Sequence, residues 1–251
     1  MKFSKNVGII AYYVEKYLFP IFFAVMAAQS GYSIYKNDLW EKVCFLGGND
    51  WGKVLVSSYN ILSAILIIIY NILVGVFLVM AQKPKREPKG AQEILIPLVA
   101  TFFYMAYSGL LWFSPAFALQ NPIPASFQFP VLIGAVTVAL GGLFLNLVSL
   151  YHLRHSFAIF AEVKEIIFSG PYKYIRHPMY TSHIMLAAGL VLSHFSLAIL
   201  AVFLIHVGII SYRAHLEEEA LASFDPKYKK YMEKTGFLVP LLQRLEPYQQ
   251  Q

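Results

Sequence analysis

The sequence is poor in cysteine and in charged residues. Its single cysteine, Cys44, excludes an internal disulfide and a cysteine-based metal cluster. Only 14% of the 251 residues are charged, whereas 58% are hydrophobic. Soluble domains contain about a quarter charged residues, so this balance predicts an integral membrane protein. We therefore expect the basic residues behind the net charge of +6 to gather at the cytoplasmic membrane face, and we expect no nucleic-acid partner.

Apolar runs of membrane-spanning length recur along the chain. The first four cover residues 17–35, 54–81, 94–119 and 129–151. A helix needs about 20 predominantly apolar residues to cross a hydrocarbon core, so each run is long enough. A removable signal peptide is the alternative for the first run, because that run follows a basic start. Pro97 and Pro115 predict kinks in the third run.

A fifth uncharged stretch, residues 178–212, is too long for one span. As a single helix its 35 residues would extend about 52 Å, against a hydrocarbon core of about 30 Å. We expect a break at residues 193–196, the most polar point of the stretch. Two spans and a partly buried hairpin both remain open. The predicted fold is therefore all-α: a polytopic transmembrane bundle of about six segments that ends in a helical hairpin.

The composition of the loops predicts how this bundle is oriented. Residues 82–93 and residues 152–177 each contain four Lys or Arg residues, whereas residues 120–128 contain none. Basic loops are retained on the cytoplasmic side of a membrane. We therefore predict a multi-pass protein with both termini in the cytoplasm and with residues 36–53, 120–128 and 193–196 outside.

One polar segment, residues 170–180, separates two apolar runs. Its sequence is Gly-Pro-Tyr-Lys-Tyr-Ile-Arg-His-Pro-Met-Tyr. Such a segment is not expected within lipid, because its backbone groups would have no hydrogen-bond partners there. Pro178 disfavours a helical conformation at His177 and is well suited to begin the next helix. We therefore expect Arg176 and His177 to lie at the membrane surface, just before a helix N-terminus.

A second ionisable cluster follows the fifth apolar stretch. It consists of Arg213 and the three consecutive glutamates 217–219. Because the two clusters lie at the two ends of one predicted hairpin, we expect them to meet at the inner membrane surface. A structural ion pair is one interpretation. Three carboxylates near the end of a helix are unfavourable for the helix dipole, which favours a second interpretation: they bind ribose hydroxyls or an ammonium group of a ligand.

The order of these motifs resembles that of the isoprenylcysteine carboxyl methyltransferase and phospholipid methyltransferase family. That family shows Gly-Pro-Tyr…Arg-His-Pro-x-Tyr, a hydrophobic hairpin, an Arg, a Glu-Glu pair and a Tyr-x-x-Tyr run ending near a Pro. This chain has each part in order, closing with Tyr228, Tyr231 and Pro240. The resemblance covers about residues 150–240. The chain departs from the pattern at Thr181-Ser182, at the third glutamate and at Asp225-Pro226.

The resemblance implies that S-adenosylmethionine binds at the cytoplasmic end of the helix bundle. It also implies methyl transfer to a lipid or to a prenylated small molecule or protein. It also implies a single membrane domain over residues 1–251, with 1–93 as an N-terminal helical extension and 94–251 as a methyltransferase-like core. Arg213 would fix an acidic substrate group, and Tyr180 would offer its ring to the sulfonium. The implied cofactor-binding residues are Gly170, Tyr172, Arg176, His177, Glu217, Glu218 and Glu219.

Several alternatives remain open at this point. The carboxylate of a prenylcysteine-type group is the first-ranked substrate because Arg213 would suit an anion, with a phospholipid amine and a small thiol as alternatives. A sterol or steroid reductase using NADPH is a rival, although its family has Asn and Gly-Glu where this chain has Met179 and Thr181-Ser182. A non-catalytic membrane scaffold is another. His183 and His206 are expected to form hydrogen bonds between helices, and no metal site is expected.

Overall fold

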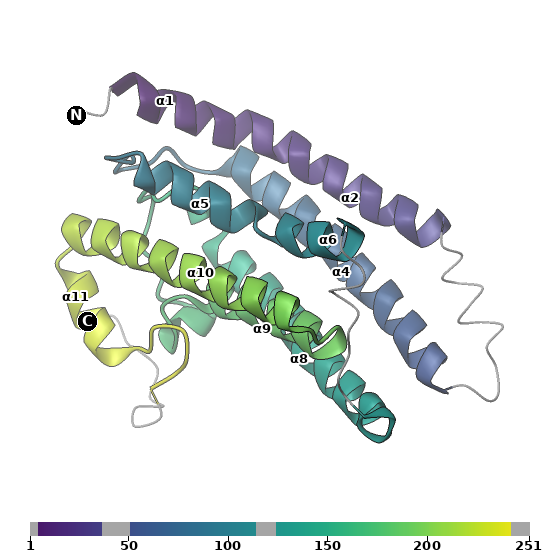
Figure 1. Ribbon diagram of the computed structural model, residues 1–251. Helices are drawn as coiled ribbons and strands as arrows, with labels where there is room; N and C mark the ends of the chain where they lie inside the picture. Colours follow the sequence, from purple (N-terminus) through teal and green to yellow (C-terminus); the bar gives the residue numbers. More distant parts are fainter. Residues whose placement is uncertain (1–4, 37–50, 114–123, 242–251) are drawn as a thin grey trace.

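A computed structural model describes residues 5–36, 51–113 and 124–241 of the chain (Figure 1). These residues form helices and connecting segments without a β-strand, so the all-α prediction is confirmed for them. Cys44 and Pro115 lie outside the described residues, as do residues 37–50 and 120–123 of the predicted outer loops 36–53 and 120–128.

The first helix is longer than the apolar run predicts. The helices α1 (Lys5–Tyr13), η1 (Val14–Leu18) and α2 (Phe19–Lys36) follow one another without a gap and form one continuous rod (Figure 1). The middle element, η1, is a π-helix. This rod begins well before residue 17, the predicted start of the apolar run. Glu15 interrupts the apolar pattern of the sequence, but its side chain is buried against other parts of the chain, so the helix extends through it. The rod packs along α4 (Trp51–Met80), where Phe19 and Phe23 meet Val74 and Leu78.

The third apolar run is divided into two helices. These are α5 (Gln92–Phe102) and α6 (Tyr104–Phe113). The interruption falls at Phe103, whereas Pro97, where a kink was expected, lies inside α5. The last turns of α5 are tied to a later helix, because Arg213 donates hydrogen bonds to the Pro97 carbonyl and the Thr101 hydroxyl.

The helices α8 (Ala125–Leu153) and α9 (Pro178–Ser193) make the closest pair in the molecule. Two glycines permit the approach. A Cβ atom at Gly142 would lie 3.0 Å from the Ser182 carbonyl oxygen, and one at Gly189 would lie 2.9 Å from the Ala135 carbonyl oxygen. Small residues let helix backbones approach in this way. The 170–180 segment leads into α9 and is thereby anchored to this helix pair.

The predicted break after α9 is confirmed. The next helix, α10 (Leu197–Phe224), begins after a short turn in which the Ser196 hydroxyl accepts a hydrogen bond from the Ile199 N–H at 3.2 Å. This is a serine N-cap, which starts a helix without the help of Gly or Pro. Helix α10 runs antiparallel to α9 and continues past Arg213 and the glutamates. The short helix α11 (Lys227–Lys234) then folds back near its end (Figure 1).

Four helices in the described residues are long and apolar enough to cross a membrane, in agreement with an integral membrane protein. They cover Val7–Tyr32, Ile61–Met80, Ser126–Ser156 and Leu197–Phe224. The stretch Gln92–Tyr107 and the 16-residue α9 are apolar but shorter. Six membrane segments and cytoplasmic termini therefore remain predictions, which helix length alone does not test.

Candidate functional site

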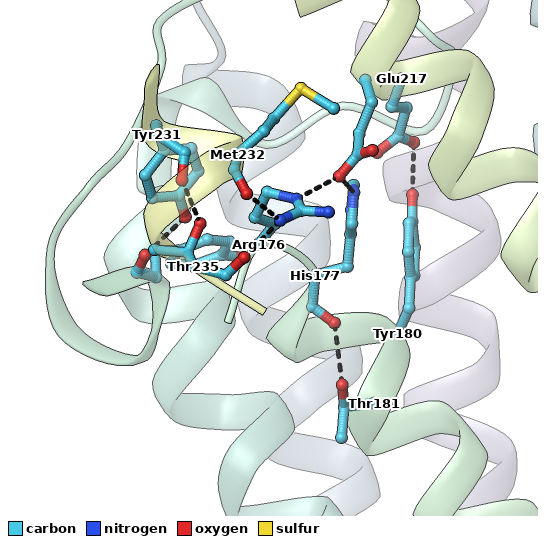
Figure 2. Close-up of polar contacts among 10 residues, drawn as sticks. Arg176, His177, Tyr180, Thr181, Glu217, Tyr231, Met232 and Thr235 are labelled. Atoms are coloured by element: carbon cyan, nitrogen blue, oxygen red, sulfur yellow. Dashed lines mark hydrogen bonds and ion pairs between the residues drawn. The ribbon is translucent and has the colours of Figure 1, made fainter. Parts of the chain in front are cut away.

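The two ionisable clusters meet in space, as predicted from the hairpin. Arg176 Nε donates to Glu218 Oε1 at 2.5 Å, and His177 Nε2 lies 3.2 Å from the same oxygen. The neighbouring carboxylate, Glu217, accepts hydrogen bonds from the Tyr180 hydroxyl and, at 3.2 Å, from Arg213 Nε. Figure 2 shows Arg176, His177 and Tyr180 in a row, with Tyr180 pointing to Glu217. The start of α9 is thus joined to the later part of α10.

The backbone around Arg176 is held by the segment after α11. The Arg176 N–H donates to the Gly236 carbonyl at 2.8 Å, and the His177 N–H donates to the Phe237 carbonyl at 3.2 Å. Pro178 begins α9, and His177 has a non-helical conformation, as expected from its place before proline. A Cβ at residue 236 would lie 1.6 Å from the Val239 carbonyl oxygen, so only glycine fits this tight turn.

Arg176 is largely satisfied by protein groups, but one of its nitrogens has no partner among the described residues. In addition to Glu218, it donates through Nη1 to the backbone carbonyls of Met232, at 2.8 Å, and Thr235 (Figure 2). Its Nη2 forms no hydrogen bond with the described residues. The guanidinium therefore has a fixed orientation and an unused pair of donors, which is the arrangement that binds an anion.

Arg213 is more fully engaged. Its Nη2 donates to the Ile159 carbonyl at 2.7 Å and its Nη1 to Thr101 Oγ1 at 3.1 Å, in addition to the bond with Glu217. The guanidinium also lies 5.1 Å from the centre of the Tyr180 ring. Arg213 thus joins α10 to α5 and to the segment after α8, and it fixes Glu217 and Tyr180.

A cavity of about 930 Å³ lies beside this network. Its polar end is lined by Arg176, His177, Tyr180, Arg213 and Glu217, together with Tyr172, Tyr228 and Tyr231. From there it extends between the helices to Ser193 and His194, at the far end of α9. The apolar part is lined by Phe22, Phe23, Met26, Leu143, Leu186 and Leu190. One cavity therefore combines a charged end with a long hydrocarbon-like wall.

Residues 130–224 match the family model for phospholipid methyltransferases. This confirms the resemblance read from the motifs and supports a membrane methyltransferase. The match runs from within α8 to the last residue of α10, so it contains the two ionisable clusters but none of α1 to α6. A comparison with curated proteins gives no match.

The structure sorts the residues that the resemblance implicates into three groups. Arg176, His177, Tyr172, Tyr180, Arg213 and Glu217 line the cavity. Glu218 lies behind them, buried, and orients Arg176 and His177. Glu219 does not join the cluster: its side chain is 65% exposed and lies 3.3 Å from His215, one turn earlier. The pair of glutamates at the cluster is therefore 217 and 218.

Gly170 acts at a distance from the cavity. Its φ of +59° lies in the left-handed region that favours glycine, and a Cβ there would lie 2.3 Å from the His152 ring. It opens the short helix η3 (Gly170–Lys173), which buries Tyr172. The Tyr172 carbonyl accepts a hydrogen bond from the Tyr231 hydroxyl at 2.5 Å. Gly170 thus shapes the loop that brings Tyr172 and Tyr231 together.

The two intramembrane histidines differ. His206 lies 3.2 Å from the Tyr107 hydroxyl through Nδ1, a hydrogen bond between α10 and α6 as expected. His183 departs from the expectation: its ring lines the cavity and forms no hydrogen bond with the described residues, and the bond to a neighbouring helix is made instead by its backbone carbonyl, which accepts from the Tyr104 hydroxyl at 2.8 Å.

Sequence reasoning missed the cavity wall that precedes Gly170. This wall includes Glu162 and Lys164, and Lys164 forms ion pairs with both Glu162 and Glu15 of the first helix. From the sequence, Lys164 is only one of the basic residues that place the loop 152–177 in the cytoplasm. A lone acid near the start of an apolar helix is a sign of a buried partner, and Glu15 was the signal that could have found this contact.

Proposed function

We propose that this protein is an S-adenosylmethionine-dependent methyltransferase that acts on a lipid-borne substrate. The observation that carries the proposal is the single cavity that joins the motif residues to an apolar wall between membrane helices. Such a cavity brings a polar cofactor and a hydrocarbon chain together without exposing either fully to water.

The residues at the polar end fit the chemical groups of this cofactor. Arg176 Nη2 is free to bind a carboxylate, such as that of the methionine part. The Glu217 carboxylate is placed to accept hydrogen bonds from ribose hydroxyls or from the amino group. The ring of Tyr228 offers an aromatic face for the positively charged sulfonium, whereas the Tyr180 ring stacks on His177 and already has the Arg213 guanidinium 5.1 Å from its centre.

When bound, S-adenosylmethionine supplies a methyl group on a good leaving group, so positioning accounts for much of the rate. In this mechanism Glu218 keeps Arg176 and His177 in place, and Arg213 keeps Glu217 and Tyr180 in place. Gly170 and Tyr172 shape the loop over the site. Arg213 has little capacity left to bind substrate directly, so its role is mainly to order the cluster.

For the substrate, we favour the carboxylate of a prenylcysteine-type group. A carboxylate is already a nucleophile at neutral pH and needs no base. The apolar part of the cavity, with Phe22, Phe23 and Met26 on one side and Leu186 and Leu190 on the other, suits a single hydrocarbon chain.

A phospholipid amine is the second candidate, and His183 favours it. An ammonium group must lose its proton before nitrogen can attack. The His183 ring lines the cavity and forms no hydrogen bond with the described residues, so a ring nitrogen is free to accept a hydrogen bond from the amine. The family match to phospholipid methyltransferases points in the same direction.

The test is methyl transfer from labelled S-adenosylmethionine by the purified protein in lipid nanodiscs. A farnesylcysteine analogue, phosphatidylethanolamine and a short alkyl thiol are offered in parallel. A volatile product released by base identifies a methyl ester and the first substrate class. Label in phosphatidylethanolamine identifies the second. Binding of NADPH instead of S-adenosylmethionine would indicate a reductase, and binding of neither would indicate a non-catalytic scaffold.

A further inference from the structure

The first helix places a buried carboxylate against the cavity wall. Glu15 lies in the π-helical turn η1 and is 2% exposed. One of its oxygens accepts hydrogen bonds from the N–H groups of Ile159 and Phe160, both at 3.1 Å. The other accepts one from Lys164 Nζ at 3.0 Å. A single side chain near the N-terminus therefore binds three donors of the segment that follows α8.

Lys164 in turn folds that segment around its ammonium group. It is 3% exposed, and its Nζ donates to the Phe157 carbonyl at 2.8 Å and lies 3.0 Å from Glu162 Oε1. Residues 157–164 are thus wrapped around one buried charge, which Glu15 fixes from outside the segment. Buried ammonium groups are rare unless they are paired in this way.

The segment after α4 holds the other side of the same wall. Val163 exchanges backbone hydrogen bonds with Arg86, at 3.0 and 3.1 Å. The Ala161 N–H donates to the Glu93 carbonyl at 3.0 Å, and the Arg86 and Glu93 side chains form a two-bond ion pair at 2.8 and 3.0 Å. Two sets of contacts therefore hold residues 157–164: the Glu15 clamp, formed by the hydrogen bonds of Glu15, and the contacts of Arg86 and Glu93. Both come from the first 93 residues of the chain.

Ile159 connects the Glu15 clamp to the proposed methyl-transfer site. Its N–H donates to Glu15, and its carbonyl accepts the bond from Arg213 Nη2 at 2.7 Å. Arg213 then bonds to Glu217 and lies against the Tyr180 ring. One residue thus separates the carboxylate of the first helix from the guanidinium that orders the cluster.

We infer that Glu15 is a positioning residue for methyl transfer: it fixes residues 157–164 so that Ile159 holds Arg213, and through it Glu217 and Tyr180, in place. The inference rests on the proposed function. It gives the N-terminal helices, which lie outside the family match, a direct part in the site. Buried ion pairs add little to stability compared with apolar side chains, so an ordering role explains better why an acid lies there.

The test compares Glu15→Gln with Lys16→Met in the full-length protein in nanodiscs. Glutamine keeps an oxygen for the N–H groups but removes the charge that faces Lys164. Lys16, the matched control, is the adjacent residue and bonds to Tyr12 on its own helix. We expect Glu15→Gln to raise amide exchange in peptides covering 157–164 and to lower kcat by about tenfold or more. The affinity for S-adenosylmethionine should fall by a smaller factor than kcat, since Arg176 is held by other groups even where Glu217 shifts. Lys16→Met should leave all three unchanged.

Each outcome is decisive. If the wild-type protein transfers methyl groups and Glu15→Gln, folded by size-exclusion chromatography, has the same kcat, the inference is wrong and the proposed function stands. Faster exchange with unchanged kcat would also overturn it, because the segment would then not control the site. An inactive wild-type protein would overturn both. Should Glu15→Gln not be recovered folded, Glu15→Asp, which keeps the charge but shortens the side chain, is expected to show a smaller fall in kcat, and an unchanged kcat in that variant would overturn the inference.

Discussion

Helices α8 to α10 carry the motifs that match a methyltransferase family, whereas α1 to α6 carry none, yet both regions line the same cavity. In the matched region the charged side chains satisfy one another: Glu218 binds Arg176 and His177, and Glu217 binds Arg213. The unmatched region supplies apolar wall and anchoring contacts. The sequence motif thus marks the charged cluster that we propose for the cofactor, and the remaining helices supply contacts and apolar wall around it.

The largest expected effect lies in the matched region, at Glu218. In Glu218→Gln the partly buried Arg176 and the buried His177 lose their shared carboxylate. We expect the affinity for S-adenosylmethionine to fall by roughly 1–3 kcal/mol, about 5- to 150-fold, and methyl transfer to fall with it. His177→Ala should have an effect in the same range. Isothermal titration calorimetry measures the affinity for S-adenosylmethionine in each variant.

The neighbouring glutamate provides the control for this prediction. Glu219→Gln changes the same chemical group one residue later, on an exposed face beside His215. We expect it to bind the cofactor as the wild-type protein does. Unchanged affinity in both Glu218→Gln and His177→Ala would show that the cofactor does not bind at this end of the cavity.

A smaller effect is expected in the unmatched region, at the apolar wall. Met26 of α2 lines the cavity, so Met26→Trp should occupy space needed by a hydrocarbon chain. We expect KM for a long-chain substrate to rise about tenfold, the equivalent of roughly 1.4 kcal/mol, with little change in cofactor affinity. Val25→Trp, on the exposed side of the same helix, is the control. Equal KM values in the two variants would mean that α2 does not contact the chain.

The comparison also separates what the sequence predicts from what it does not. The break at residues 193–196 follows from chain length alone, and the meeting of Arg176 with Glu218 follows from the hairpin that this break creates. Contacts between distant segments leave no such local pattern. Glu15 and Lys164 are 149 residues apart, and neither belongs to a motif. For the same reason the early start of the first helix was missed, since Glu15 is tolerated there only because of its distant partners.

The contact between the matched and unmatched regions contains a buried carboxyl group, Glu162, from which we predict a pH effect on stability. Burial, followed by the nearby Glu15 charge, raises the pKa of Glu162 from 4.5 to about 7, although Lys164 opposes the shift. Between these two values the folded state binds more protons than the unfolded state, so lowering the pH through this window stabilises the fold. The slope is at most about 1.4 kcal/mol per pH unit.

Thermal unfolding of the wild-type protein and Glu162→Gln, measured from pH 8 to pH 4.5, tests this expectation. The melting temperature of the wild-type protein should rise relative to that of the variant as the pH falls from about 7 to 4.5, because only the wild-type protein takes up the proton. Other carboxyl groups titrate in both proteins and cancel in the difference. A difference that is constant with pH would show that Glu162 is ionised throughout.

The last prediction concerns orientation and should leave activity unchanged. If the basic loop 82–93 lies in the cytoplasm, it is on the same side as the cofactor site, and both regions then present their charged ends to one compartment. A membrane-impermeant thiol reagent added outside intact cells should modify Cys44 in the wild-type protein. In a Cys44→Ser background it should modify Ser126→Cys and not Gly90→Cys. Both positions accept cysteine, because Ser126 is exposed and a Cβ at Gly90 has no neighbour within 4 Å. Labelling of Gly90→Cys with protection of Ser126→Cys would invert the topology and would place the Arg176 cluster on the outer side, where S-adenosylmethionine made in the cytoplasm cannot reach it.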